Sequence, residues 1–129
     1  MKSEYQQTRF LVDETGPVPD QFGVVTACNP DGATVGDEQN RAATERLRSQ
    51  LANEGLHFFP VTGCSPDLRH QEPGFGIVTD DRDVIIELGR SWRQDAIFWI
   101  EHGTVHLVPC GDGEAVTLGQ WSSLVRQPG

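Results

Sequence analysis

Polar side chains follow the most apolar stretch of this chain, at the point where a strand ends and a loop leads into a helix. Thr26 lies at the end of the apolar run 22–27, and Asn29 follows it directly. Asn40 lies in the first turn of the helix that comes next. Hydroxyl and amide groups on such a rigid frame can match the hydrogen-bond pattern of a small polar ligand. We therefore interpret this junction as one wall of a candidate binding site.

Glu72 and Gln94 are the other side chains whose positions suggest chemistry. Glu72 directly precedes an expected strand, where a carboxylate can act as a general base. Gln94 lies two residues before another strand. Each has a simpler interpretation, because a carboxylate in a loop is commonly just solvated and amides commonly bond the backbone of turns. The sequence alone leaves both interpretations open.

The loop Asp31–Gly36 precedes a helix, and helix N-termini attract anions. The loop lacks the Lys-Ser/Thr ending of a nucleotide-binding P-loop. Asp31, Asp37 and Glu38 would also repel a phosphate group. We interpret the segment as an ordinary turn with a helix cap.

The chain has three cysteines and four histidines, but their spacing does not indicate a metal site. His102 and His106 form the one pair with zinc-like spacing, and they straddle an expected hairpin turn. We interpret Cys28 and Cys64 as small buried hydrophobic residues. We therefore expect no metal and no cofactor.

The overall charge argues against nucleic acid and membranes as partners. Nineteen acidic residues face ten basic ones, which gives a net charge of −9. Binding to phosphates needs clustered Lys and Arg, and no apolar run approaches the roughly 20 residues that cross a bilayer. The N-terminus lacks the apolar stretch of a signal peptide, and three widely spaced cysteines fit a reducing compartment. We expect a cytoplasmic protein.

Apolar patterning predicts six strands and two helices. The strands are expected at 8–13, 22–27, 56–62, 74–79, 96–100 and 104–108, with a loop at 14–20. The first helix starts after Thr34 or Gly36, buries Ala43, Leu47 and Leu51, and stops at Gly55. The second runs from about 81 to 91 with Asp80 as its cap and Val84, Ile85 and Leu88 facing inward.

We expect one globular domain over residues 1–129, with flexible ends at 1–7 and 122–129. The order β-β-α-β-β-α-β-β places pairs of strands between the helices. It favours an α+β fold with a mixed or largely antiparallel sheet and helices on one face. The nearly continuous apolar character of 22–27 indicates a central strand that is buried on both faces.

A series of short motifs runs in order along the chain. It consists of Thr26-Ala27-x-Asn29-Pro30-x-Gly32, Asn40, Leu47 and Leu51, Gly63, Glu72-Pro73 and Gln94-x-Ala96-x-Phe98. Over roughly residues 8–108 this series resembles the bacterial domain of unknown function 3293 family, with Cys28 where the family typically has Trp. The resemblance implies a compact bacterial protein and carries no assigned activity. It groups five residues as the characteristic polar positions: Thr26, Asn29, Asn40, Glu72 and Gln94.

Three hypotheses follow for the function. The first is a binding module whose amide-lined cleft holds a small polar ligand. The second is a hydrolase-like or transferase-like enzyme with Glu72 as general base and Asn29 or Gln94 stabilising developing charge. The third is an acidic domain that binds a basic protein partner, in which the polar set is purely structural.

Overall fold

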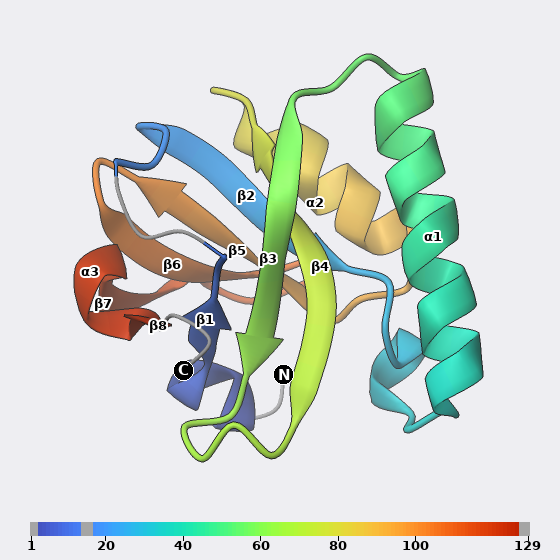
Figure 1. Ribbon diagram of the computed structural model, residues 1–129. Coiled ribbons are helices and arrows are strands. Elements are labelled where there is room, and N and C mark those ends of the chain that lie inside the picture. The colour runs from blue at the N-terminus through green and yellow to red at the C-terminus, as the bar shows by residue number, and fades with distance from the viewer. Residues whose placement is uncertain (1–2, 14–16, 127–129) are drawn as a thin grey trace.

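The computed structural model describes residues 3–13 and 17–126, so parts of the expected loop 14–20 and of the expected flexible ends lie outside the described residues. Within this part of the chain, eight strands form one curled sheet, and two main helices lie against it (Figure 1). The strands are β1 (Arg9–Leu11), β2 (Gln21–Thr26), β3 (Phe58–Cys64), β4 (Gln71–Val78), β5 (Ala96–Glu101), β6 (Thr104–Pro109), β7 (Val116–Gln120) and β8 (Val125–Arg126). The helices are α1 (Asp37–Asn53), α2 (Arg82–Ser91) and the short α3 (Trp121–Leu124), with 3-10 turns η1 (Ser3–Gln7) and η2 (Pro30–Gly32).

The sheet has the strand order β7-β6-β5-β2-β4-β3-β1-β8. Every neighbouring pair is antiparallel except β1 and β8, which are parallel. The predicted α+β class with a largely antiparallel sheet is confirmed. β2 lies inside the sheet between β5 and β4, and its residues 22–25 are all buried, as the apolar run predicted.

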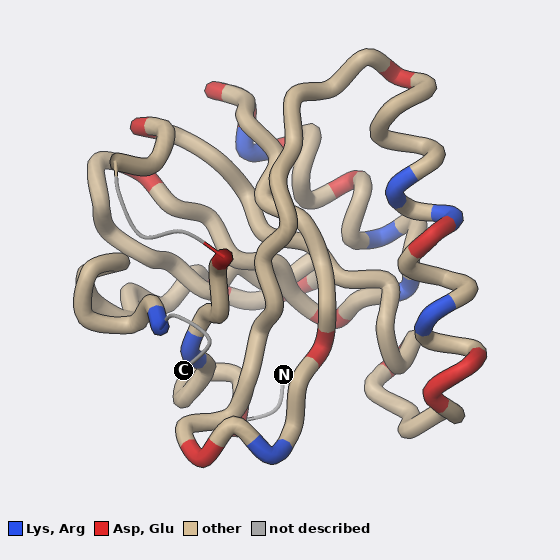
Figure 2. Tube along the Cα trace, in the orientation of Figure 1, with Lys and Arg blue, Asp and Glu red and all other residues tan. Residues whose placement is uncertain are grey.

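Helix α1 forms where the sequence predicted it. Ala43, Leu47 and Leu51 are its buried residues, and they join the core between the helices and the sheet. Many of its exposed positions are charged, and Figure 2 shows acidic and basic residues following one another along the helix. Gly36 is the N-cap residue, and the helix ends before Gly55, which adopts a left-handed φ of 70°.

Helix α2 packs on the same side of the sheet, so the prediction that both helices cover one face is confirmed (Figure 1). The cap is Asp81 rather than Asp80, because its side chain accepts a hydrogen bond from the backbone N of Asp83 at 3.0 Å. Ile85 is fully buried, whereas Val84 is 39% exposed and does not face inward as expected. Ile85 packs directly onto Gly23 of β2, where a Cβ atom would lie 2.5 Å from its side chain.

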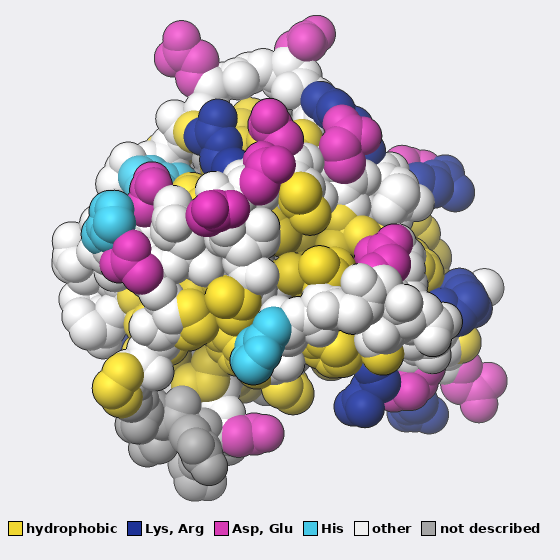
Figure 3. All heavy atoms as spheres, turned by 90° about the horizontal axis from the view of Figure 1, so that it is seen from above, with side chains coloured by type: hydrophobic (Ala, Val, Ile, Leu, Met, Phe, Trp, Pro, Cys, Tyr) yellow, Lys and Arg dark blue, Asp and Glu magenta, His cyan; other side chains and the backbone are white. Residues whose placement is uncertain are grey.

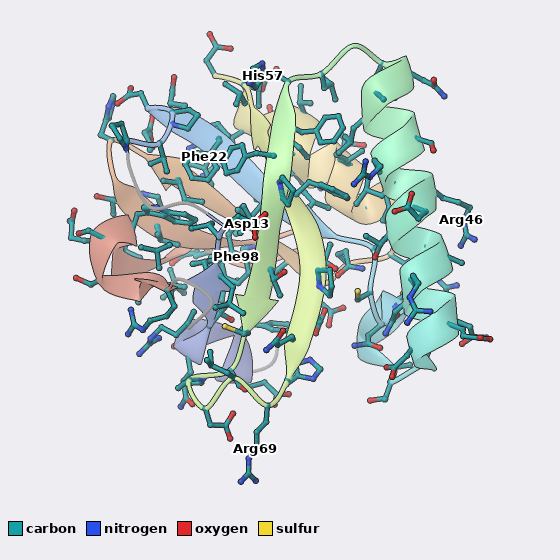
Figure 4. All side chains as sticks on the ribbon, in the orientation of Figure 1. Asp13, Phe22, Arg46, His57, Arg69 and Phe98 are labelled. Atoms are coloured by element: carbon teal, nitrogen blue, oxygen red, sulfur yellow. The ribbon has the colours of Figure 1, made fainter. Side chains whose placement is uncertain are left out.

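The other face of the sheet curls around an aromatic core. Phe10 stacks on Trp121 at 5.0 Å between ring centroids, and Phe22 meets Trp121 edge-on at 5.2 Å. Phe22 and Phe98 both point into this interior in Figure 4. Trp121 belongs to α3, which carries the chain from the edge strand β7 to β8 at the opposite edge. α3 therefore brings the two edges of the curl together.

Several elements were not expected from the sequence. They are β7, α3 and β8 at the C-terminal end and η1 at the N-terminal end; η1, β8 and most of α3 fall in the segments 1–7 and 122–129 that were predicted as flexible ends. β4 also begins at Gln71, three residues earlier than the expected start at Gly74. Glu72 consequently lies within a strand instead of preceding one, which corrects the prediction for this residue.

Candidate functional site

The inner side of the curled sheet opens at one end into a cavity of about 360 Å³. The ends of β2 and β3 and the starts of β4 and β5 surround it, and Glu4 and Tyr5 of η1 also line it. The end of β3 and the start of β4 lie in the lower half of Figure 1, near the N-terminus. The cavity is therefore framed mainly by strand ends of a hydrogen-bonded sheet, which hold side chains in fixed positions.

The floor of the cavity is apolar. It is formed by inward-facing strand residues, namely Val24, Val61, Phe98 and Leu107. Because side chains alternate along a strand, Thr26 faces the same side as Val24, two residues closer to the opening. The strands thus change from apolar to polar residues as they leave the core.

Two glycines create the space above this floor. Gly74 is the partner of Thr26 across β2 and β4, and Gly63 is the partner of Glu72 across β3 and β4. Both glycines line the cavity, and neither contributes a side chain to fill it. At Gly74 a Cβ atom would lie 2.4 Å from the backbone oxygen of Val25, so this position accepts only glycine.

The structure brings four of the five predicted site residues to one cavity. Thr26, Asn29, Glu72 and Gln94 line it, whereas Asn40 does not. Asn40 instead lies behind Asn29 and holds it. Its Oδ1 accepts a hydrogen bond from the backbone N of Asn29 at 2.9 Å, and its Nδ2 donates to Asn29 Oδ1 at 3.1 Å. Asn29 adopts a left-handed backbone conformation with φ of 49°, which this pair of bonds helps to maintain.

Thr26 and Gln94 also bond the backbone around the cavity. Thr26 Oγ1 donates to the carbonyl of Pro73 at 2.8 Å and accepts from the backbone N of Cys28 at 3.0 Å. Gln94 Nε2 donates to the carbonyls of Cys28 and Trp92, each at 3.1 Å. The Oε1 atom of Gln94 accepts no hydrogen bond from residues 3–13 or 17–126. The amides thus form a structural network and line a cavity at the same time.

Glu72 pairs with His70 at the opening of the cavity. Glu72 Oε2 and His70 Nε2 are 2.7 Å apart, and the Glu72 side chain is only 23% exposed. Such a pair can hold an imidazole in one orientation or share a proton with it. The neighbouring hydroxyl and thiol are already occupied, since Ser65 Oγ donates to Asp67 at 2.6 Å and Cys64 Sγ donates to the Arg9 carbonyl at 3.3 Å. Burial also raises the pKa of the Cys64 thiol, which keeps it protonated.

Comparison with known families identifies the family to which these residues belong. A family model described as protein of unknown function DUF3293 matches residues 25–97. The chain belongs to this family. The match confirms the resemblance carried by the sequence motifs and includes all five predicted polar residues. No curated protein and no solved structure matches the chain.

The DUF3293 match does not include η1, which supplies residues that sequence reasoning missed. Glu4, Tyr5 and the following Thr8 line the cavity, and Tyr5 OH donates to Asp95 Oδ2 at 3.2 Å. Burial, followed by the carboxylates of Asp95, Glu72 and Glu4, raises the pKa of Tyr5 to about 12. The polar composition of this segment predicted a flexible end. Its single aromatic residue, which is also the only tyrosine of the chain, was the available signal.

Residues 3–13 and 17–126 contain no group of three or more His, Cys, Asp and Glu side chains arranged to hold a metal ion. No helix in this part of the chain is long and apolar enough to cross a membrane.

Replacing Asn40 tests the structural part of the network. We expect Asn40→Ala to lower the free energy of unfolding by about 1–3 kcal/mol, because the backbone N and Oδ1 of Asn29 each lose a partner. Urea denaturation measures the change, and Gln39→Ala, which alters an exposed neighbour on the same helix, is the matched control. Equal stability of the two variants would contradict this role for Asn40.

Tyr5 offers a direct optical test of the η1 contact. Because it is the only tyrosine, phenolate absorbance reports its titration alone. We expect it to titrate near pH 12 in the native protein and near its ordinary value of 10.0 in urea. Since the folded-state pKa is the higher one, its contribution to stability is present below pH 10 and is lost as the pH rises toward 12. A native titration at the ordinary value would show that Tyr5 does not pack against Asp95.

Proposed function

We propose that this DUF3293 protein is a binding module that holds a small polar ligand in the cavity at the end of the curled sheet. The observation that carries the proposal is the cavity itself, about 360 Å³ in volume, with an apolar floor and a polar rim. Ligand sites commonly have volumes of roughly 300–1,000 Å³ and a few fixed polar groups on an apolar lining. The hydrogen bonds of Thr26, Asn29 and Gln94 to the protein support the proposal because they fix the rim in advance of binding.

A hydrolase-like enzyme is the second candidate, and the Glu72–His70 pair favours it. In that case Glu72 would act as a general base, directly or through His70, on a substrate seated in the cavity. Ser65 and Cys64 are bonded elsewhere, which favours attack by water over attack by a side chain. Binding requires none of these steps, and it is therefore the simpler use of the same geometry.

An acidic protein-interaction surface has less support. Figure 3 shows one face of the molecule, on which acidic side chains are interspersed with basic ones. A single uninterrupted acidic face would fit a basic partner better.

We also propose that the protein works in the cytoplasm. Cys28, Cys64 and Cys110 are all free and buried, which fits a reducing compartment.

A thermal-shift screen against metabolites and nucleotides tests the binding function. A ligand that binds only the folded state stabilises it by roughly 2.7 kcal/mol at a concentration of one hundred times Kd. We expect Gly63→Ala to weaken the shift, because its methyl group enters the cavity. The nearest atom to that methyl would be Thr8 Cγ2 at 3.7 Å, so the fold should tolerate it.

The control for the screen is Gly111→Ala, whose new Cβ has no atom within 4 Å. Ligand-induced shifts should be unchanged in this variant. A hit that Glu72→Gln still binds but no longer converts would favour the enzyme. The absence of any hit, or hits that Gly63→Ala and Gly111→Ala bind equally well, would contradict the proposal.

A further inference from the structure

The charged residues that line the cavity are almost all acidic. Glu4, Glu72 and Asp95 contribute carboxylates from three separate segments of the chain, namely η1, β4 and the turn before β5. His70 is the one basic side chain among the lining residues, and no Lys or Arg lines the cavity in the part of the chain that the structure describes. A ligand here meets three carboxylates and one imidazole.

We infer that the ligand is a small organic cation, with an ammonium or guanidinium group at the rim and a short apolar body on the floor. This inference rests on the proposed binding function and adds the chemical class of the ligand.

The rim offers acceptors for such a cation. Three oxygen atoms accept no hydrogen bond within residues 3–13 and 17–126, namely Glu72 Oε1, Asp95 Oδ1 and Gln94 Oε1. The other polar atom of each side chain is bonded: Glu72 Oε2 to His70, Asp95 Oδ2 to Tyr5, and Gln94 Nε2 to the carbonyl of Cys28. The bonded atom holds each side chain in place, and the free oxygen can accept a hydrogen bond from the ligand. Charge-assisted hydrogen bonds from N–H donors to carboxylates are about twice as strong as neutral ones.

The electrostatic environment of Tyr5 agrees with this assignment. Burial is the largest cause that raises the pKa of Tyr5, and the negative charges of Asp95, Glu72 and Glu4 follow it. The three carboxylates therefore all contribute to the electrostatic potential at the Tyr5 hydroxyl. The same field that opposes a phenolate would oppose an anionic ligand. His70 does not reverse it, because this side chain is 63% exposed and its Nε2 faces Glu72.

The floor argues for an organic ion over an inorganic one. Val24, Val61, Phe98 and Leu107 offer no ligand to a metal, and they favour an apolar body next to the charged group. The acidic side chains stand apart around the rim, and residues 3–13 and 17–126 provide no cluster that would hold a metal ion. An amine or guanidine with a compact hydrocarbon portion matches both parts of the cavity.

Three probes of the same shape test the inference. Cyclohexylmethylammonium, cyclohexylmethanol and cyclohexanecarboxylate share one apolar ring and differ in the charge of the head group. We would titrate each into the ¹⁵N-labelled protein and follow the backbone amides of Thr26, Gly63 and Gln94 by NMR. We expect the ammonium compound to bind at least about tenfold more tightly than the alcohol, with the carboxylate weakest.

Neutral variants identify the carboxylates responsible. Glu72→Gln and Asp95→Asn should each reduce the preference for the ammonium compound over the alcohol several-fold. Glu114→Gln removes the same charge from an exposed residue outside the cavity and should leave the preference unchanged.

The possible outcomes separate this inference from the binding function itself. Equal or tighter binding of the alcohol or the carboxylate would overturn the cation assignment and leave the binding function intact. The cation assignment alone also fails if none of the three probes shifts the cavity amides while a compound from the thermal-shift screen does. If neither the probes nor any compound from the screen shifts these amides, both proposals fail.

Discussion

One constraint determines the rest of the structure: a single sheet must bury the apolar side chains on both of its faces. Helices α1 and α2 bury one face, where Ile85 packs onto Gly23. No second layer covers the other face within residues 3–13 and 17–126, so the sheet curls on itself around Phe10, Phe22 and Trp121. Burial of these aromatic rings provides the hydrophobic stabilisation that maintains the curl. α3 carries Trp121 into this core, which makes residues 121–126 part of the fold.

The same curl explains the cavity. Aromatic side chains fill the interior over part of its length, but toward the ends of β2 and β3 the inward positions are taken by Thr26, Gly63 and Gly74. A curled sheet whose inner residues become small leaves a hollow with an apolar floor. Hydrogen bonds of Thr26 and Gln94 to backbone carbonyls then fix the rim. The packing of the core thus shapes the site that we propose for ligand binding.

Much of this could be predicted from the sequence because local patterns carry it. The stripe of Ala43, Leu47 and Leu51 specifies α1, and the apolar run 22–27 specifies a buried central strand. The motifs also singled out Thr26, Asn29, Glu72 and Gln94, which line one cavity. Asn40 was expected to line the site with them, but it lies behind the cavity and bonds Asn29, because its position depends on how α1 docks, which sequence spacing does not encode.

The parts that were missed depend on contacts between distant segments. η1 and β8 are short polar or mixed stretches with no periodicity of their own, and they are ordered by pairing or packing with residues far along the chain. The early start of β4 at Gln71 has the same origin, because its pairing with Cys64 of β3 extends the strand beyond its apolar portion. Residue propensity predicts that a strand ends where its apolar residues end, whereas hydrogen bonding to the neighbouring strand extends it beyond that point.

The hollow end of the curl is, in our proposal, a binding site. Soaking crystals of the protein with a library of small polar fragments tests this most directly, because each bound fragment reports its own location. We predict that fragments concentrate in the cavity, with apolar parts on Val61 and Phe98 and polar parts near Glu72 and Gln94. Fragments found only on the outer surface of α1, or scattered over the molecule with the cavity left empty, would contradict it.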